Sequence, residues 1–280
     1  MKNKEREMMM KITVRILMMF VITLLAGNAM AAEKLQIDGS TTVGPIGDAF
    51  AEAFKDKVSI TVSKTGSGDG AAALVEGRCD IAMMSRFMKD KEYKAAVNKD
   101  IYPVAHAIAM DGVCPIVHPS NPVKGLTSDQ IRAIYKGEIT NWKDLGGADR
   151  PIVMISRDTS SGTYETFHKL VMKKEKMTDS VEYVNSNPQA HARVKSTVGA
   201  IGYVGLGFLD RNVKALTIDG IKPSQSTISK GTFPVSRPLF LFTNGYPKLG
   251  SVVHAFCTFH LTEEGQEIIE DKGFVPVTDY

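Results

Sequence analysis

The sequence predicts an α/β protein with two lobes. Short apolar or β-branched segments alternate with segments whose apolar residues have helical spacing along almost the whole chain. Residues 102–118 form a long apolar run that takes the chain into a second lobe, and the apolar strand at 239–243 takes it back. Two crossings predict two hinge strands, and 280 residues suffice for two moderate lobes.

In the first lobe, two units of strand, hydroxyl-rich turn and helix are expected, followed by a third strand that ends in a polar pair and by a charged helix. Pro45 suits the first turn of the first helix, and Gly77 ends the second helix. The expected strands are 34–37, 58–64 and 79–84, and the expected helices are 45–54, 71–76 and 89–99.

The rest of the chain continues the alternation. Residues 102–112 and 113–118 are expected as consecutive strands, and residues 137–142 as a turn that holds the only Trp. Further strands are expected at 151–155, 181–184, 200–205, 213–218 and 239–243, further helices at 126–135, 164–172, 188–196, 251–259 and after 262, and residues 273–277 form the tail.

The first thirty residues have the pattern of a secretory signal peptide. A basic start precedes an apolar run at residues 16–26, and Ala29 and Ala31 occupy the positions that signal peptidase recognises. We therefore expect residues 1–31 to be removed on export. A signal anchor is the alternative, although the apolar run is short for a bilayer span.

The charge of the chain does not point to a nucleic-acid partner. The net charge is +3, and residues 1–31 alone carry five basic and two acidic side chains, also +3. Subtracting one from the other leaves a mature chain of about zero charge, which gives no support for nucleic-acid binding.

No metal site or cofactor is predicted. Cys79, Cys114 and Cys257 show no CxxC spacing, and the six His residues show no HxH or HExxH spacing. One disulfide and buried free thiols both remain open for the cysteines.

The turn at residues 156–163 is the strongest candidate for a binding site. It joins the expected strand 151–155 to the expected helix 164–172 through Ser-Ser-Gly-Thr, which places backbone N–H groups and hydroxyls at the positive end of a helix. Arg157 adds a guanidinium that fits two oxygens of an oxyanion. An ordinary helix cap is the alternative for this turn alone.

Similar turns recur in the first lobe. Residues 38–44 and 65–70 are rich in Gly, Ser and Thr, and Ser85-Arg86 follows another buried strand. In open α/β sheets, ligands bind at the carboxyl ends of the strands. A flexible turn or a surface pair would explain each alone, but together the turns predict a bound oxyanion.

These residues carry a family resemblance that covers essentially the whole mature chain. The segments 38–43, 65–68, 80–86 and 157–163, in this order and spacing, resemble the periplasmic phosphate-binding proteins of the high-affinity phosphate ABC transporter. The resemblance implies a type II periplasmic binding fold, in which each lobe is a mainly parallel sheet flanked by helices. Lobe 1 would comprise residues 32–112 and 232–280, and lobe 2 residues 113–231.

The resemblance also implies a site and partners. A periplasmic monomer would bind inorganic phosphate between its lobes and deliver it to a membrane permease. The phosphate-binding residues would be Ser40, Thr41, Thr42, Ser67, Ser85, Arg86, Arg157, Ser161, Gly162 and Thr163.

One position departs from several family members, which have an aspartate where this chain has Arg86. That aspartate accepts the proton of hydrogen phosphate, a proton that sulfate lacks at neutral pH. Asp69 is the acceptor we predict here, with Asp38 and Asp158 as alternatives. Arg86 either holds such a carboxylate or contacts phosphate itself.

Other functions stay open at this point. A different tetrahedral oxyanion, another ligand, or a sensor or adhesion role would suit the same fold. A secreted phosphatase would need a nucleophile with its base, or a metal. The chain has no Gly-x-Ser-x-Gly motif and no nucleotide-binding phosphate loop, so we expect no enzyme.

Overall fold

A ten-stranded mixed sheet forms the framework of the described chain. The computed structural model describes residues 34–278, which belong to one compact unit. The sheet order is β2-β1-β3-β11-β4-β8-β6-β7, and β9 and β12 also pair with β4. The strands are β1 (Lys34–Gly39), β2 (Ser59–Ser63), β3 (Ile81–Met84), β4 (Pro103–Val117), β6 (Val153–Arg157), β7 (Glu182–Val184), β8 (Ala200–Gly205), β9 (Lys214–Ala215), β11 (Ser236–Asn244) and β12 (Val275–Pro276). A separate pair joins β5 (Gly125–Leu126) to β10 (Thr217–Ile218).

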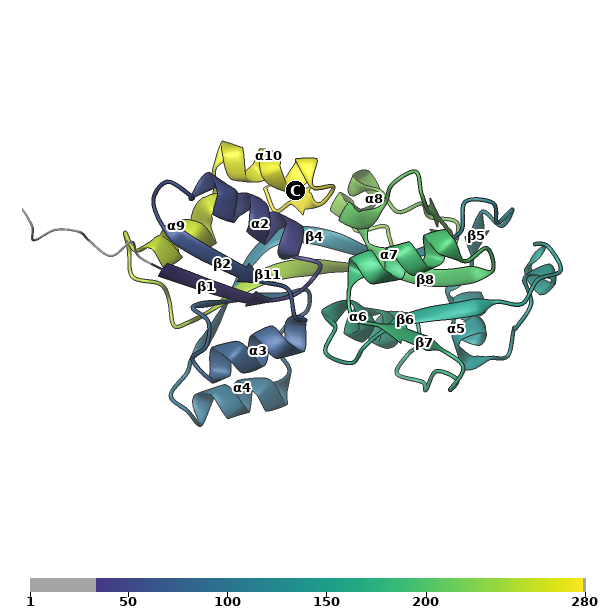
Figure 1. The fold of residues 1–280 in the computed structure, drawn as a ribbon, viewed down its shortest axis with the longest axis horizontal. Helices are drawn as coiled ribbons and strands as arrows, with labels where there is room; N and C mark the ends of the chain where they lie inside the picture. The colour runs from purple at the N-terminus through teal and green to yellow at the C-terminus, as the bar shows by residue number, and fades with distance from the viewer. Residues whose placement is uncertain (1–33, 279–280) are drawn as a thin grey trace, which may run out of the picture. The chain divides into compact units, whose positions relative to one another are not determined.

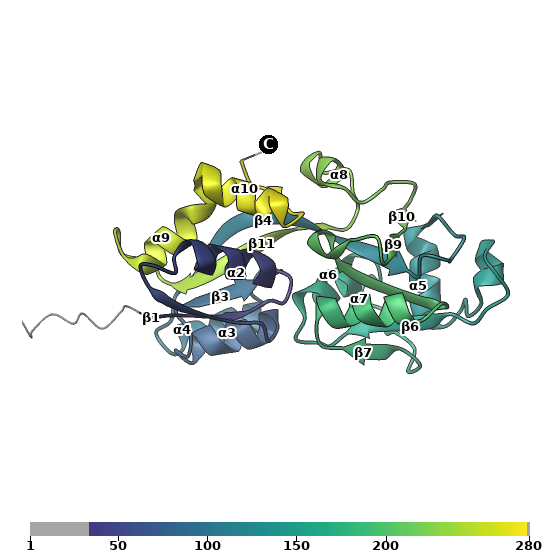
Figure 2. The ribbon, with the colours of Figure 1, turned by 45° about the horizontal axis from the view of Figure 1, so that its top comes forward.

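The first lobe packs helices against the parallel strands β1, β2 and β3 (Figures 1 and 2). Alternate residues of β1, such as Leu35 and Ile37, are buried against Ile46 and Phe50 of the first helix. This alternation is what a strand with one face on the core requires. The helices of this lobe are α2 (Gly44–Ala53), α3 (Ser67–Val75), α4 (Asp90–Val97), α9 (Val252–Thr258), the short η3 (Phe259–Leu261) and α10 (Glu263–Asp271).

The second lobe is built on β8, β6 and β7, which are parallel to one another. Phe167 stacks on Tyr203 with ring centroids 4.0 Å apart, and the buried Trp142 donates through Nε1 to the carbonyl of Gly199 at 2.9 Å. The only Trp is thus a packing residue. The helices are α5 (Ser128–Lys136), η1 (Trp142–Leu145), α6 (Gly162–Leu170), α7 (Asn187–Ser196), η2 (Leu206–Phe208) and α8 (Gln225–Ser229).

Two antiparallel strands, β4 and β11, join the lobes (Figures 1 and 2). β4 pairs with β11 as far as Gly112 and with β8 from Val113 onward. The sequence predicted two consecutive strands here, but the chain forms one strand without a turn. The predicted pair of hinge strands is therefore present, with each strand longer than expected.

Two helices begin earlier than their apolar spacing predicts. α3 starts at Ser67 instead of residue 71, and α6 starts at Gly162 instead of residue 164. In both cases the first turn is made of small polar residues that do not show in a hydrophobic pattern. The hydroxyl-rich turns thus include the first turns of helices.

Two further findings concern the described residues 34–278. Cys79, Cys114 and Cys257 are free thiols in the core, and burial raises the pKa of Cys79 and Cys257 to about 12. No helix in this range is long and apolar enough to cross a membrane. The predicted signal peptide, residues 1–31, lies outside the described residues.

Candidate functional site

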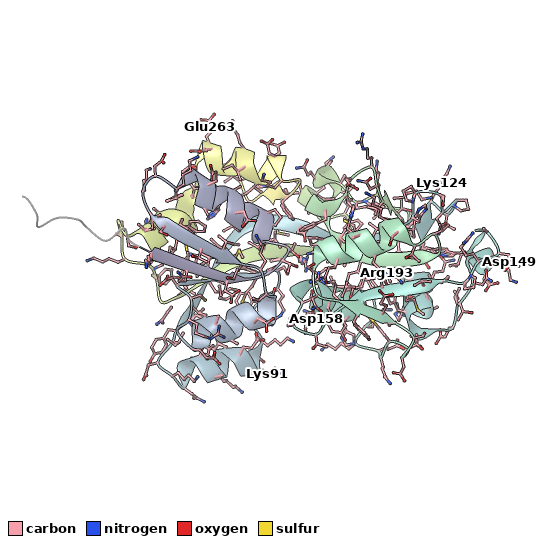
Figure 3. All side chains as sticks on the ribbon, in the orientation of Figure 1. Lys91, Lys124, Asp149, Asp158, Arg193 and Glu263 are labelled. Carbon is pink, nitrogen blue, oxygen red and sulfur yellow. The ribbon has the colours of Figure 1, made fainter. Side chains whose placement is uncertain are left out.

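The hydroxyl-rich turns of the two lobes meet between β1, β3 and β6. Thr42 Oγ1 of the first lobe lies 2.9 Å from Thr163 Oγ1 of the second, and the backbone N–H of Gly68 donates to the carbonyl of Ser160 at 2.8 Å. Figure 3 shows Asp158 at the end of the second lobe that faces the first. Residues far apart in the sequence therefore form one cluster.

Three of the helices that begin at this cluster follow hydroxyl-rich turns that the sequence singled out. The Ser40 hydroxyl accepts hydrogen bonds from the N–H groups of Thr42 and Val43, at 3.1 and 3.3 Å, before α2. Ser161 is the N-cap of α6, and its Oγ accepts from the Tyr164 N–H at 3.2 Å. α3 follows Gly66, which adopts a φ of 140° and has no side chain to cap the helix. The positive ends of three helix dipoles thus converge.

Ser67, Ser85 and Gly162 approach one another closely. Ser67 Oγ lies 3.2 Å from Ser85 Oγ and accepts from the Ser85 N–H at 3.0 Å. A Cβ atom on Gly162 would lie only 2.5 Å from either hydroxyl oxygen, so no side chain fits there. Glycine at this position lets the second lobe reach the first.

Arg157 is a buried guanidinium without a carboxylate partner among the described residues. Its Nη2 donates to Thr41 Oγ1 at 3.2 Å and to the carbonyl of Asn185 at 2.9 Å, whereas Nη1 is buried with no hydrogen-bond partner. Burial lowers the pKa of Arg157 from 12.5 to about 10. A buried cation of this kind calls for a bound anion.

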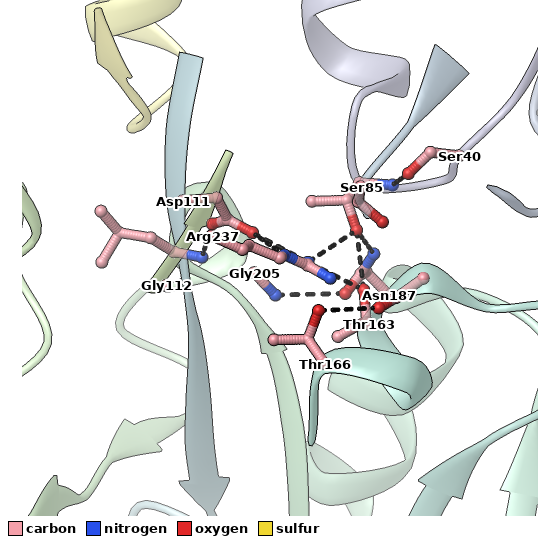
Figure 4. Close-up of polar contacts among 12 residues, drawn as sticks. Ser40, Ser85, Asp111, Gly112, Thr163, Thr166, Asn187, Gly205 and Arg237 are labelled. Atoms are coloured by element: carbon pink, nitrogen blue, oxygen red, sulfur yellow. Dashed lines mark hydrogen bonds and ion pairs between the residues drawn. The ribbon is translucent and has the colours of Figure 1, made fainter. Parts of the chain in front are cut away.

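The structure adds two site residues that the sequence analysis missed, Asn187 and Arg237 (Figure 4). Asn187 Nδ2 donates to Thr41 Oγ1 at 3.1 Å and to Thr42 Oγ1 at 2.9 Å. Arg237 Nη2 donates to Thr163 Oγ1 at 2.9 Å and to Thr42 Oγ1 at 3.3 Å. A faint signal for Arg237 existed, because it is a charged residue beside an apolar strand.

Asp111 holds Arg237 in place. Its Oδ2 accepts from Arg237 Nε at 3.0 Å and Nη2 at 2.8 Å, and the two residues face each other across β4 and β11. Asp111 is fully buried, which raises its pKa, and Arg237 opposes that shift. Asp111 is the only charged residue in the apolar run 102–118, a signal that could have indicated a buried partner.

Arg86 has its guanidinium turned to Glu92. Nη1 and Nη2 donate to the two carboxylate oxygens of Glu92 at 2.8 and 2.7 Å, and Nη1 also donates to the carbonyl of Phe87 at 2.9 Å. Both side chains are largely buried. Of the carboxylates that Arg86 was expected to hold, none is its partner; Glu92 of α4 takes that place.

The three candidate proton acceptors differ in exposure. Asp69 is exposed in the first turn of α3, and Asp38 Oδ1 accepts from Thr65 Oγ1 at 2.7 Å. Asp158 Oδ1 accepts from the N–H and the hydroxyl of Ser160, while Oδ2 is buried without a partner. Asp158 is the candidate with an unoccupied buried acceptor.

The other predicted site residues are brought together. All of the predicted phosphate-binding residues are buried, and each except Arg86 directs polar atoms to the cluster between the lobes. Within residues 34–278, no group of His, Cys, Asp and Glu is arranged to hold a metal ion. The cluster is made of hydroxyls, amides and guanidinium groups, which are donors to an anion.

The fold and this cluster define a two-lobed binding protein for an anionic ligand. The family model of the PBP superfamily domain matches residues 26–264. The phosphate-binding protein PstS of Bacillus subtilis is 33% identical over 261 residues, which cover 90% of this chain and 84% of the relative. The chain therefore belongs to the PBP superfamily and, within it, to the PstS family.

Solved structures agree with this assignment. A putative phosphate ABC transporter substrate-binding protein from Clostridium perfringens, solved with bound phosphate, superposes with a TM-score of 0.81 at 36% identity and covers 88% of this chain and 100% of that one. An ABC-type phosphate transport receptor from Vibrio cholerae has a TM-score of 0.70 at 31% identity, with 86% and 99% covered. The type II periplasmic binding fold expected from the sequence is confirmed.

Proposed function

We propose that this protein captures inorganic phosphate between its lobes and delivers it to the permease of an ABC transporter. The observation that carries the proposal is Arg157, a buried guanidinium with an unpaired Nη1 and no carboxylate partner among the described residues. Thr41 accepts a hydrogen bond from Arg157 Nη2, and Asn187 links Thr41 to the neighbouring hydroxyls of Thr42 and Thr163. A buried divalent anion is stable only when nearly all its oxygens accept hydrogen bonds.

The remaining predicted residues complete the proposed site. Ser40, Ser67, Ser85, Ser161 and Gly162 supply hydroxyls and helix N-termini from both lobes. The lobes close about β4 and β11, with lobe boundaries at 112/113 and 231/232. Arg86 does not contact the anion in this proposal, because both of its terminal nitrogens donate to Glu92.

The acceptor of the phosphate proton is proposed to be Asp158, with Asp69, the residue expected from the sequence, as the alternative. Asp158 Oδ2 is buried and unpaired, whereas Asp69 is exposed. Asp158→Asn should lower the preference for phosphate over sulfate, and Asp69→Asn serves as the matched control. The reverse pattern would return the role to Asp69.

Titration calorimetry with phosphate and with sulfate tests the proposed function. Phosphate should release or absorb heat with saturation at one site, and sulfate should bind far more weakly. Heat with sulfate alone would favour another oxyanion, and no binding of either would reject the proposal. A phosphatase assay with p-nitrophenyl phosphate should give no turnover, because the relatives are binding proteins and we propose no enzymatic activity.

The cellular setting is part of the proposal. The protein acts as a periplasmic monomer, exported by the predicted signal peptide at residues 1–31, and no nucleic acid or cofactor takes part. Fractionation of cells that express the full chain, together with light scattering of the purified protein, tests both the location and the oligomeric state.

A further inference from the structure

We propose that Arg237 and Asn187 are positioning residues that leave the hydroxyl of Thr41 and one hydroxyl of the Thr42–Thr163 pair as donors to the bound anion. The inference rests on the proposed function and extends it to residues outside the predicted site. A threonine hydroxyl has one proton and two acceptor lone pairs, so its neighbours decide whether it donates or accepts. The hydrogen bonds of this cluster fix that choice.

Thr41 is the first hydroxyl to be fixed. Its Oγ1 accepts from Arg157 Nη2 at 3.2 Å and from Asn187 Nδ2 at 3.1 Å. Both donors are N–H groups, so both lone pairs are occupied. The orientation of the Asn187 amide is consistent, because its Oδ1 accepts from the Gly205 N–H at 3.2 Å. The Thr41 proton is therefore left for a ligand.

Thr42 and Thr163 act as a pair. Thr42 Oγ1 accepts from Asn187 Nδ2 at 2.9 Å, and Thr163 Oγ1 accepts from Arg237 Nη2 at 2.9 Å. The two hydroxyl oxygens lie 2.9 Å apart, so one hydroxyl donates its proton to the other. Because Arg237 Nη2 has two protons and gives one to Asp111 Oδ2 at 2.8 Å, its 3.3 Å contact with Thr42 shares the proton that it gives to Thr163. In either direction of the Thr42–Thr163 bond, the other hydroxyl of the pair keeps a proton for the ligand.

Arg237 is well placed to impose this order. It lies on β11 and faces Asp111 on β4, so this ion pair connects the two strands that join the lobes. Its Nη2 reaches a hydroxyl of each lobe, and this arrangement exists only when the lobes are together. Arg237 thereby links closure of the lobes to the orientation of the donors (Figure 4).

A double-mutant cycle between Arg237 and Thr163 tests the proposal. Removing Arg237 alone would leave Asp111 buried and unpaired, so the variant used is Arg237→Gln with Asp111→Asn, which keeps an acceptor for the Leu206 N–H. Thr163→Val removes the hydroxyl at nearly constant volume. Phosphate affinity is measured by calorimetry, and folding by urea denaturation.

The expected result is a non-additive loss. The Arg237→Gln/Asp111→Asn protein should bind phosphate about tenfold or more weakly, the loss of one hydrogen bond to a charged group. In the Thr163→Val protein, the fold loss of phosphate affinity caused by Arg237→Gln/Asp111→Asn should be at least about threefold smaller, because the hydroxyl that Arg237 positions is absent. Thr163→Ser keeps a hydroxyl and should preserve the full effect.

Several results would overturn the inference. Equal effects of Arg237→Gln/Asp111→Asn with and without the Thr163→Val substitution would show that Arg237 does not act through the hydroxyl. The same holds if the variant folds and binds phosphate as the unmodified protein does. If the unmodified protein binds no phosphate, the proposed function itself fails. If the Arg237→Gln/Asp111→Asn protein does not fold, Asn187→Leu replaces it. The double-mutant cycle then combines Asn187→Leu with Thr41→Val and is measured in the same way.

Discussion

Replacing Arg157 should separate the affinity for phosphate from the stability of the protein. Arg157→Met keeps an unbranched, flexible side chain and removes its charge. The lost contact is the hydrogen bond that the unpaired Nη1 makes to the anion, worth about 1.5–3 kcal/mol for a charged partner. Attraction between unit charges 4 Å apart near a protein surface reaches about 4 kcal/mol. Phosphate affinity should therefore fall between about tenfold and about a thousandfold.

The free energy of unfolding without phosphate should change little. Burial lowers the pKa of Arg157 from 12.5 to about 10, which means that the charged guanidinium is disfavoured in the folded protein by about 3 kcal/mol. Methionine removes that penalty but also three hydrogen bonds, to Thr41, Val184 and Asn185, of about 1 kcal/mol each. The two contributions offset each other to within about 1 kcal/mol.

Calorimetry gives the affinity, and urea denaturation with and without phosphate gives the stability. Arg78→Met, which removes an exposed arginine paired with Glu76, is the matched control and should leave both unchanged. Unchanged phosphate affinity in Arg157→Met would refute the reasoning. A fall in affinity accompanied by an equal loss of stability in the absence of phosphate would refute it as well.

Gly162, Arg86 and two histidines, the half-buried His106 and the buried His260, provide further tests. Gly162→Ala should abolish tight phosphate binding and leave the lobes apart in small-angle scattering, because its Cβ would lie 2.5 Å from Ser67 Oγ and Ser85 Oγ; normal binding would contradict the close approach. Arg86→Met should lower the free energy of unfolding by about 2–3 kcal/mol, because its two hydrogen bonds to Glu92 are lost. Phosphate affinity should change less than about threefold. A large loss of affinity would show that Arg86 contacts the anion directly. Burial lowers the pKa of His106 and His260 below the usual 6.5, so at acidic pH the unfolded chain takes up protons that the folded chain does not. The free energy of unfolding should therefore fall as the pH drops below about 6.5. Replacing both histidines with Gln should make this fall smaller in urea denaturation, and an unchanged dependence on pH would contradict the expectation.

The sequence was most informative where local chemistry and fold agree. The sequence predicted that the Ser, Thr and Gly turns after β1, β3 and β6 lie close together. The reason is that the carboxyl ends of such strands meet at one edge of each sheet. The buried positions of Thr41, Ser67 and Ser161 follow from this rule. The same reasoning missed the true starts of α3 and α6, since their first turns carry no apolar periodicity.

The residues that escaped the sequence analysis act across long distances in the chain. Arg237 and Asp111 are 126 positions apart and meet only because β4 and β11 pair antiparallel in one particular register. Asn187 enters the cluster from the first turn of α7, where Ser186 and Pro188 look like an ordinary helix start. Arg86 was assigned to the anion because it follows a strand end, yet Glu92 of the next helix binds it.

A crystal structure of the protein with phosphate tests the central claim most directly. We expect a tetrahedral anion within hydrogen-bond distance of Arg157 Nη1, Thr41 Oγ1 and Thr163 Oγ1, with donors from both lobes. Phosphate bound at another surface, with Arg157 Nη1 still unpaired, would contradict it.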